Sequence, residues 1–276
     1  MIRILSDLGP CMPFINGIKD DPVYSDPHFC TPEQQRANLF DTVGKKDYLA
    51  LGVFRNDALI GLFNFTIIEA ERYVEMLIGF SRAYEAYEEI ADHLAANYPG
   101  YHVDFVFNPQ NDLIIKTLEK RGAAFDPEMQ KMVLTDDPTQ IDTDGIVPLS
   151  DPFKDAYIAL HTTDCYWTGD KVVEALDVFK VLLAIDRDEV VGYIDITHDS
   201  DENEPFDLFV KETHRRKGWG RKLLFRAIEE NRPRGMVLFV EVDNVPALSL
   251  YRSMGFTKTE NGNSRLGTWH VPAKTE

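Results

Sequence analysis

The residues with the clearest potential for chemistry form a basic turn that contains two glycines. Residues 215–222 read RRKGWGRK, after an apolar segment at 206–210 and before a helical apolar pattern that begins at Leu223. A glycine turn between a strand and a helix exposes unpaired backbone N–H groups at the positive end of the helix dipole. This arrangement predicts a binding site for a phosphate or a pyrophosphate.

The charge around this turn is opposite to that of the whole chain. The chain has 29 Lys and Arg against 46 Asp and Glu, a net charge of −17, whereas residues 211–222 hold six basic side chains and one acidic one. Binding to nucleic acid or to an anionic membrane needs a broad basic face, so neither partner is expected. Nucleotide hydrolysis also fits poorly, because Gly220 is followed by Arg221-Lys222 and not by the Lys-Ser/Thr pair of a P-loop.

A second pattern follows one predicted strand later. Residues 244–256 read NVPALSLYRSMGF, a short helix that is ended by glycine. In this order, the two motifs resemble the acyl-CoA loop and the second signature of the GCN5-related N-acetyltransferase (GNAT) family. The resemblance covers about residues 145–270, whereas residues 1–135 share the layout but lack the first motif.

The resemblance implies how acetyl-CoA would be bound. Loop amides around Arg216–Arg221 would hold the pyrophosphate, because glycine lets phosphate approach the main chain and the arginines add charge-assisted contacts. The main chain of Leu208–Val210 would pair with the pantetheine arm like an added strand, and Asn244 would meet the arm from the opposite strand. The positions assigned to the co-substrate are Leu208, Phe209, Val210, Arg215, Arg216, Lys217, Gly218, Trp219, Gly220, Arg221, Asn244 and Ala247.

The implied reaction is direct attack of a neutral primary amine on the thioester in a ternary complex. Tyr251 is the expected general acid, since a phenol of pKa about 10 can protonate a leaving thiolate whose conjugate acid has a pKa of about 8.5. The acceptor ammonium must first lose a proton, and Glu204 and Asp207 are the nearest acidic candidates. A main-chain N–H would stabilise the carbonyl oxygen. No cysteine stands in either motif to form an acyl-enzyme.

Each of these residues also has a purely structural interpretation. Tyr251 suits a core position that packs its helix onto the sheet, and Asn244 suits a helix N-cap, which is compatible with ligand binding. Glu204 and Asp207 fit plain surface carboxylates in so acidic a chain. The basic turn fits a solvated helix start.

The elements that must position these residues occur twice along the chain. Asn111 and Gly122 bracket a helical pattern as Asn244 and Gly255 do, at an offset of 133 residues, and the hairpin signal at 54–61 resembles that at 185–192. We predict an α/β (α+β) fold of two tandem GNAT-like units, each a mixed, mostly antiparallel twisted sheet flanked by helices. In the second unit we expect strands at 180–185, 190–197, 206–211 and 236–242 and a helix at 219–231.

The acidic, Pro/Gly-containing segment 136–145 predicts the joint between the units. Residues 1–138 are expected to form a degenerate GNAT-like domain, and residues 139–276 the domain that binds acetyl-CoA. The first unit has no glycine pair at 78–90, and Leu118 stands where the second has Tyr251. It is therefore expected to scaffold its partner or to help form the acceptor site, without binding acyl-CoA.

Composition sets the remaining expectations. No apolar run approaches the roughly 20 residues that span a bilayer, and Cys11, Cys30 and Cys165 are too few and scattered for a disulfide framework or a zinc site. We expect a cytoplasmic monomer or homodimer without metal that acetylates a small amine, with a cationic molecule favoured by the negative charge. A non-catalytic acyl-CoA-binding or regulatory module, or an acetyltransferase acting on a protein amine, are the alternatives.

Overall fold

The computed structural model of the chain describes residues 1–29, 31–163 and 166–273. The chain divides into two compact units: unit 1 comprises residues 1–130 and the segment from Glu260, and unit 2 comprises residues 131–259. Cys30 and Cys165 lie outside the described residues, and Cys11 is a buried free thiol. None of the helices in the described ranges is long and apolar enough to cross a membrane.

The two halves of the sequence exchange a strand. Strand β15 (Arg265–His270) lies between β5 (His102–Phe107) and β6 (Ala124–Phe125) in the sheet of unit 1, and β7 (Met129–Leu134) lies between β13 (Gly235–Glu241) and β14 (Phe256–Lys258) in unit 2. The units therefore differ from the predicted ranges 1–138 and 139–276. Alternating burial identifies a strand but not the sheet that it joins, so the sequence pattern gave no sign of the exchange.

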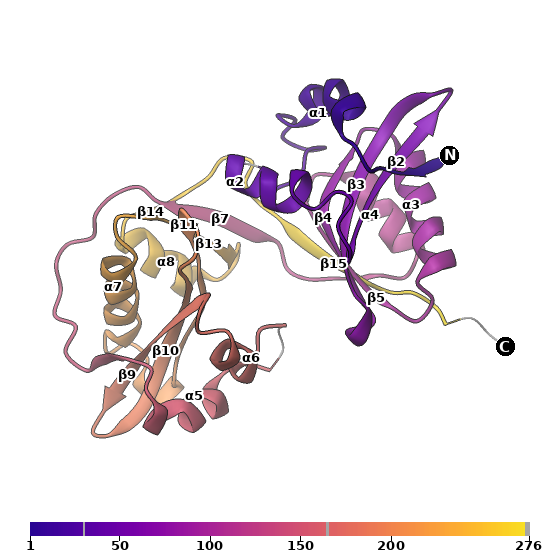
Figure 1. Cartoon of the computed structure of the whole chain (residues 1–276). Coiled ribbons are helices and arrows are strands. Elements are labelled where there is room, and N and C mark those ends of the chain that lie inside the picture. The colour runs from indigo at the N-terminus through magenta and orange to yellow at the C-terminus, as the bar shows by residue number, and fades with distance from the viewer. Residues whose placement is uncertain (30, 164–165, 274–276) are drawn as a thin grey trace. The chain divides into compact units, whose positions relative to one another are not determined.

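Unit 1 contains one seven-stranded sheet in the order β1-β2-β3-β4-β5-β15-β6, antiparallel except for the β4–β5 pair (Figure 1). Its further strands are β1 (Ile2–Ile4), β2 (Tyr48–Arg55), β3 (Ala58–Ile68) and β4 (Tyr73–Ser81). Its helices are α1 (Met12–Ile18), α2 (Pro32–Gln35), α3 (Tyr84–Asn97) and α4 (Asp112–Lys120). Buried residues of α3 and α4 pack on one face of the sheet, and those of α1 and the segment after it on the other.

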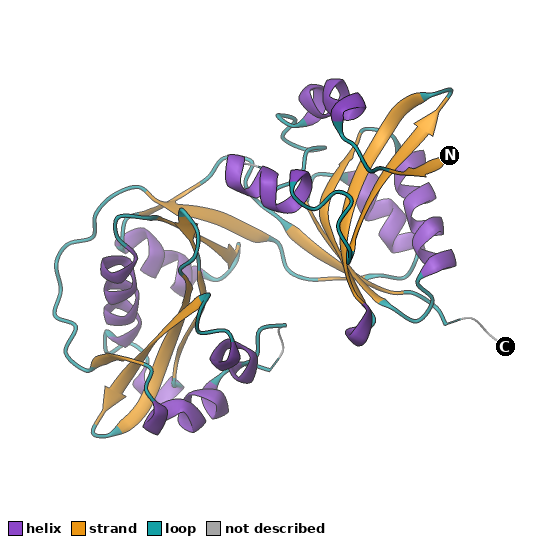
Figure 2. Ribbon diagram, in the orientation of Figure 1, coloured by secondary structure: helices purple, strands orange, loops and turns teal. Residues whose placement is uncertain are grey.

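Unit 2 contains two four-stranded sheets, ordered β12-β10-β9-β8 and β11-β13-β7-β14. Its further strands are β8 (Ile146–Pro148), β9 (Phe179–Asp186), β10 (Glu189–Thr197), β11 (Glu202–Asn203) and β12 (Pro205–Val210). Its helices are α5 (Lys154–Leu160), α6 (Gly169–Glu174), α7 (Trp219–Asn231) and α8 (Val245–Ser253), shown in purple in Figure 2. The predicted strands are correct to within one residue at each end, and the helix at 219–231 is confirmed.

The core of unit 2 has two layers because both faces of its central strands are buried. On β9, Leu182 and Ala184 pack against α7, whereas Val181 and Leu183 pack against α5 and α6. This is the alternation that a strand requires. Each fully buried aliphatic side chain contributes roughly 1.5–3 kcal/mol. The helices are therefore held firmly on the sheet, and the loops between them are the variable parts.

The structure repeats the local features that predicted two related units. The turns between β2 and β3 and between β9 and β10 both place two non-glycine residues at positive φ: Asn56 and Asp57 in unit 1, and Arg187 and Asp188 in unit 2. Such paired left-handed residues are typical of two-residue hairpin turns. The helices α4 and α8 are both capped by an asparagine side chain and followed by a glycine at positive φ.

In unit 2 the sheet opens between β12 and β13. These two fully described strands belong to different sheets and are joined by no ladder, although the short strand β11 still pairs with the start of β13. A bulge on β12 marks the opening: Asp207 pairs with Asp195 and Pro205 with Ile196, which leaves Phe206 as the extra residue. The edge of β12 that faces β13 is therefore left without a partner strand along most of its length.

Candidate functional site

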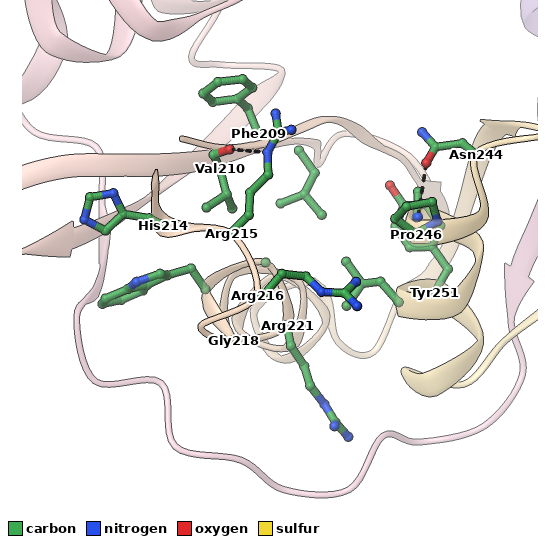
Figure 3. A pocket seen from close by; sticks show the side chains of 15 residues that line it. Phe209, Val210, His214, Arg215, Arg216, Gly218, Arg221, Asn244, Pro246 and Tyr251 are labelled. Carbon is green, nitrogen blue, oxygen red and sulfur yellow. Dashed lines mark hydrogen bonds between the residues drawn. The ribbon is translucent and has the colours of Figure 1, made fainter. Parts of the chain in front are cut away.

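A pocket of about 480 Å³ lies in unit 2 at the end of β12, between the start of α7 and α8 (Figure 3). Most of the positions predicted to contact the co-substrate line it, together with Tyr251 and three residues to which the sequence assigned no contact. The lining residues are Leu208, Phe209, Val210, His214, Arg215, Arg216, Gly218, Trp219, Gly220, Arg221, Asn244, Pro246, Ala247, Leu250 and Tyr251. Segments some 40 residues apart in sequence are thus brought to one cavity.

The glycine turn has the backbone that the sequence predicted. Gly218 precedes α7 with φ +91°, and Arg216 also adopts a left-handed conformation with φ +63°. Only glycine adopts such a φ without steric cost, and a Cβ at Gly218 would project into open space at the pocket. No side chain caps α7 and no acidic residue lies in its first turn. Its first N–H groups are therefore available to an anion.

Four cations of the turn have no carboxylate partner among the described residues. The other two basic residues of segment 211–222 are paired: Lys211 with Glu189 at 2.6 Å and Lys222 with Asp142 at 2.9 Å. Arg215, Arg216, Lys217 and Arg221 are exposed and form no ion pair within the described ranges. Figure 3 shows the Arg216 side chain extending toward α8 and the Arg221 side chain turned away from it. In so acidic a chain, unpaired arginines beside uncapped N–H groups indicate a site for an external anion.

The open edge of β12 offers main-chain hydrogen-bonding groups to the same cavity. The Lys211 N–H donates to the Val191 carbonyl at 2.8 Å. Because hydrogen-bonded pairs alternate along an antiparallel ladder, Leu208 and Val210 direct their N–H and C=O groups away from β10. The Arg215 Nε–H donates to the Val210 carbonyl at 3.0 Å, in agreement with this direction. The Leu208 N–H faces the gap that the splayed strand leaves.

Asn244 caps α8 as the structural interpretation predicted. Its Oδ1 accepts from the Ala247 N–H at 3.2 Å, and the residue also lines the pocket. Of the three lining residues outside the predicted set, His214 lies 3.5 Å from Asp186, and Pro246 and Leu250 add apolar surface from α8. Leu250 could have been predicted, because it lies three residues after Ala247 on the same face of the helix. His214 gave no sequence signal beyond its place in the basic segment.

Two predicted cofactor positions differ from the rest. Lys217 does not line the pocket: it lies in the exposed turn between Arg216 and Gly218, both of which adopt positive φ and redirect the chain. Trp219 does line the pocket, and it also packs against Gly145, where an added Cβ would come within 3.0 Å of the indole ring. Trp219 therefore also packs the segment before β8 against α7.

Tyr251 is half-buried at the inner end of the pocket and packs edge-on against Phe256, with ring centroids 5.9 Å apart. Burial, reinforced by the negative charges of Asp207 and Glu204, raises the pKa of Tyr251 to about 12. The phenol therefore keeps its proton at neutral pH. The effect of both charges on the phenol indicates that Tyr251 lies near the two carboxylates.

Glu204 and Asp207 lie on either side of the β12 bulge, and neither lines the pocket itself. Burial raises the pKa of Glu204 to about 7, partly offset by the positive charge of Lys131. Within the described residues no hydrogen bond reaches the Glu204 carboxylate. Asp207 differs, because its Oδ2 accepts from the Tyr193 hydroxyl at 2.6 Å. A carboxylate with a pKa near neutrality and no internal partner is suited to proton transfer.

In the described part of the chain, no group of three or more His, Cys, Asp or Glu side chains is arranged to hold a metal ion. The expectation of metal-independent chemistry stays a prediction.

Comparison with known proteins supports the sequence-based resemblance. Residues 177–258 match the family model described as acetyltransferase (GNAT) domain. This range contains the bulge, the basic turn and α8. Over 104 residues the chain is 31% identical to the mycothiol acetyltransferase of Corynebacterium glutamicum (strain R), a match that covers 34% of this chain and 36% of that protein. The chain thus matches about a third of that relative's length.

Solved structures share the fold across the whole chain. A GCN5-related N-acetyltransferase from Sphaerobacter thermophilus superposes with a TM-score of 0.66 at 12% identity, covering 100% of this chain and 97% of that one. A tandem GNAT protein from the clavulanic acid biosynthesis pathway gives a TM-score of 0.51 at 12% identity, with 86% and 88% covered. Residues 177–258 therefore match an acetyltransferase (GNAT) domain, and the chain as a whole shares its fold with solved GCN5-related N-acetyltransferases.

Proposed function

We propose that this protein transfers the acetyl group of acetyl-CoA to a primary amine by direct attack in a ternary complex formed at unit 2. The observation that carries the proposal is the continuity of one cavity from the uncapped start of α7, along the open edge of β12, to Tyr251. The cavity begins with anion-binding groups and ends at a proton donor. That order suits a long co-substrate with a diphosphate at one end and a reactive thioester at the other.

The residues of the turn fit a diphosphate. The N–H groups of the first turn of α7 point at the pocket mouth, where Gly218 adds no Cβ, and Arg216 supplies a positive charge that no described carboxylate neutralises. The Leu208 N–H, on the exposed edge of β12, is the nearest main-chain donor for the oxygen of a thioester carbonyl. These groups would bind and orient acetyl-CoA.

Two titratable groups near the bulge, Glu204 and Tyr251, would carry the protons. Glu204, with a pKa of about 7, takes a proton from the acceptor ammonium. The neutral amine nitrogen then bonds to the thioester carbon, and the carbon–sulfur bond breaks. Tyr251 donates its proton to the leaving thiolate, so the products are an N-acetyl amine and CoA as free thiol. The nitrogen gives up its second proton as the amide forms, and this proton restores the Tyr251 phenol, while Glu204 releases the first proton to solvent.

The test is an assay of free thiol release with acetyl-CoA and a panel of amines, together with calorimetry of CoA binding. Replacing Arg216 by glutamine should weaken CoA binding about 10-fold, the value of a charge-assisted hydrogen bond. Lys217→Gln removes the same charge one residue away, outside the pocket, and should weaken binding less. Binding of CoA without thiol release for any amine, including peptide amines, would instead identify a non-catalytic acyl-CoA module. Equal effects of the two variants would contradict the proposed diphosphate site.

A further inference from the structure

A buried polar cluster beneath the bulge of β12 has no part in the reaction as proposed. His161, at the end of α5, and Asp195, on β10, have fully buried side chains whose Nε2 and Oδ2 atoms lie 2.8 Å apart. The Tyr157 hydroxyl donates to Asp195 Oδ1 at 2.9 Å. The ring of Tyr193 stacks on His161 with centroids 5.0 Å apart. Such a cluster is costly to bury and therefore calls for a function.

The hydrogen bonds fix the charge of this cluster. His161 Nδ1 faces the Thr162 carbonyl at 2.9 Å, so this nitrogen must carry a proton. One further proton lies between His161 Nε2 and Asp195 Oδ2, since both oxygens of Asp195 have donors directed at them. Burial alone would lower the pKa of His161, but the hydrogen bonds to Asp195 and Thr162 outweigh it and raise the pKa. The His161–Asp195 pair thus has no net charge.

The negative charge of Asp207 is not balanced by the His161–Asp195 pair, which has no net charge. Its Oδ2 accepts from the Tyr193 hydroxyl at 2.6 Å and lies 3.9 Å from His161 Nε2, whose proton is already engaged by Asp195. The Asp207 side chain is 26% exposed, so part of the carboxyl group is accessible from outside the protein. A carboxylate that is held in one orientation, and whose cationic neighbour His161 is already engaged by Asp195, suits a contact with a positively charged ligand group.

The surroundings of Asp207 also suit a cation. Phe206, the bulge residue before it, is 38% exposed, and its ring packs against Phe179 with centroids 6.0 Å apart. An exposed aromatic ring beside a carboxylate is a favourable setting for an ammonium group. Glu204 lies on the other side of Phe206. Asp207 follows Glu204 by three positions, so their Cα atoms are at most roughly 10 Å apart.

We propose that the acceptor carries two cationic groups: one is the amine that Glu204 deprotonates and that is acetylated, and Asp207 binds the other. The acceptor class is therefore a short diamine or a molecule with two ammonium groups at a similar spacing. Tyr193 and His161 are positioning residues, because they hold Asp207 in place without touching the acceptor. This inference rests on the proposed acetyltransferase activity of unit 2.

The test compares putrescine and cadaverine with butylamine and pentylamine, each assayed at saturating acetyl-CoA. The wild-type protein should have a KM about 10- to 100-fold lower for a diamine than for the monoamine of equal length, the range expected for a hydrogen bond to a charged group. In Asp207→Asn the KM for the diamine should rise by that factor while kcat changes little, so that the preference for diamines disappears. Asp188→Asn is the matched control: it removes the same charge from an exposed hairpin turn, at a positive φ that asparagine tolerates.

The positioning residues are tested with Tyr193→Phe, which keeps the ring and removes the donor. This variant should lose part of the preference for diamines. The ratio of the two kcat/KM values does not depend on the folded fraction, so reduced stability alone leaves it unchanged. Equal KM values for diamines and monoamines in the wild-type protein would overturn the inference while the acetyltransferase activity stands. Absence of thiol release with every amine would overturn both.

Discussion

Units 1 and 2 share one scaffold, and the residues at its open edge distinguish them. Gly61 pairs with Ser81 in unit 1 as Gly192 pairs with Val210 in unit 2. Each unit has a one-residue bulge four residues before this pair: Leu77 on β4, before Ser81, and Phe206 on β12, before Val210. After its bulge, β4 leaves the parallel ladder with β5, which ends at Met76. The opening of the sheet is therefore a property of the scaffold, and it does not by itself make a binding site.

The same main-chain donor meets different partners in the two units. Gly79 corresponds to Leu208 by register, and its N–H donates at 2.9 Å to the carboxylate of Asp26, a fully buried side chain of the loop before α2. Arg82 and Asn108 hold this loop through Asp21 and the Pro22 carbonyl. A buried N–H needs a partner, whether from the chain or from a ligand. Unit 1 supplies its own, whereas unit 2 leaves the position open.

The side chains around the bulge also differ between the two units. Ile78 and Leu118 of unit 1 are buried apolar residues at the positions of Asp207 and Tyr251. Glu75, the counterpart of Glu204, is retained, and burial followed by the charge of Asp104 raises its pKa. Unit 1 has thus kept the backbone opening and one carboxylate but lacks the proton donor and the basic turn. The comparison indicates which groups in unit 2 serve a ligand.

Replacing Tyr251, the proposed proton donor of unit 2, should have the largest effect. We expect Tyr251→Phe to reduce kcat by about 10²- to 10⁴-fold, the usual contribution of a general acid, while CoA binding measured by calorimetry is retained. Leu118→Met is the control, since it alters the equivalent position of unit 1 by a volume-conserving change and should leave turnover unaffected. Full turnover of Tyr251→Phe would show that Tyr251 only packs α8 onto the sheet.

Glu204 gives a test in the pH profile. Because its pKa is about 7 and the ionised form is the base, kcat/KM should rise with pH and level off above about 8. Glu204→Gln should remove this rise and lower kcat about 10²-fold. Its counterpart, Glu75→Gln in unit 1, should change neither. A pH profile that persists in Glu204→Gln would assign the proton transfer to another group.

Local features of the chain were predictable, whereas features made by distant segments were not. The turn before α7 and the Asn-to-Gly span of α8 follow from short motifs, because the requirement of Gly218 for positive φ is local. The exchange of β7 and β15 had no local signal, since alternating burial says nothing about the partner strand. The His161–Asp195 pair joins residues 34 positions apart, in no motif, and was likewise missed.

Asp26 makes the stability of unit 1 sensitive to pH. Burial raises the pKa of the Asp26 carboxyl to about 8, far above that of a solvated aspartate, while hydrogen bonds from the His28 and Gly79 amides oppose the shift. A raised carboxyl pKa stabilises the fold at low pH. Its contribution falls by about 1.4 kcal/mol per pH unit as pH rises from about 4 towards 8. Denaturant unfolding at several pH values should show this slope, and Asp26→Asn should remove it.

The control for this slope is Asp20→Asn, an exposed aspartate of the same segment, which should leave it in place. Because unit 1 also lacks the glycine turn, the wild-type chain and Asp26→Asn should both bind a single CoA. A stoichiometry of two in the wild-type chain would contradict the difference between the units. A second CoA in Asp26→Asn alone would mean that the loop is what excludes the ligand from unit 1.

The smallest effect is expected from two matched glycine substitutions. Gly218 of unit 2 and Gly122 of unit 1 have φ values of +91° and +72°, and neither would place a Cβ within 4 Å of other atoms. Alanine at either position should therefore cost about 1 kcal/mol of stability through backbone strain alone. Only Gly218→Ala also puts a methyl group at the mouth of the pocket, where we expect it to weaken CoA binding several-fold. If Gly122→Ala weakens CoA binding equally, the effect of Gly218→Ala reflects stability, and the close approach of phosphate to the α7 backbone is contradicted.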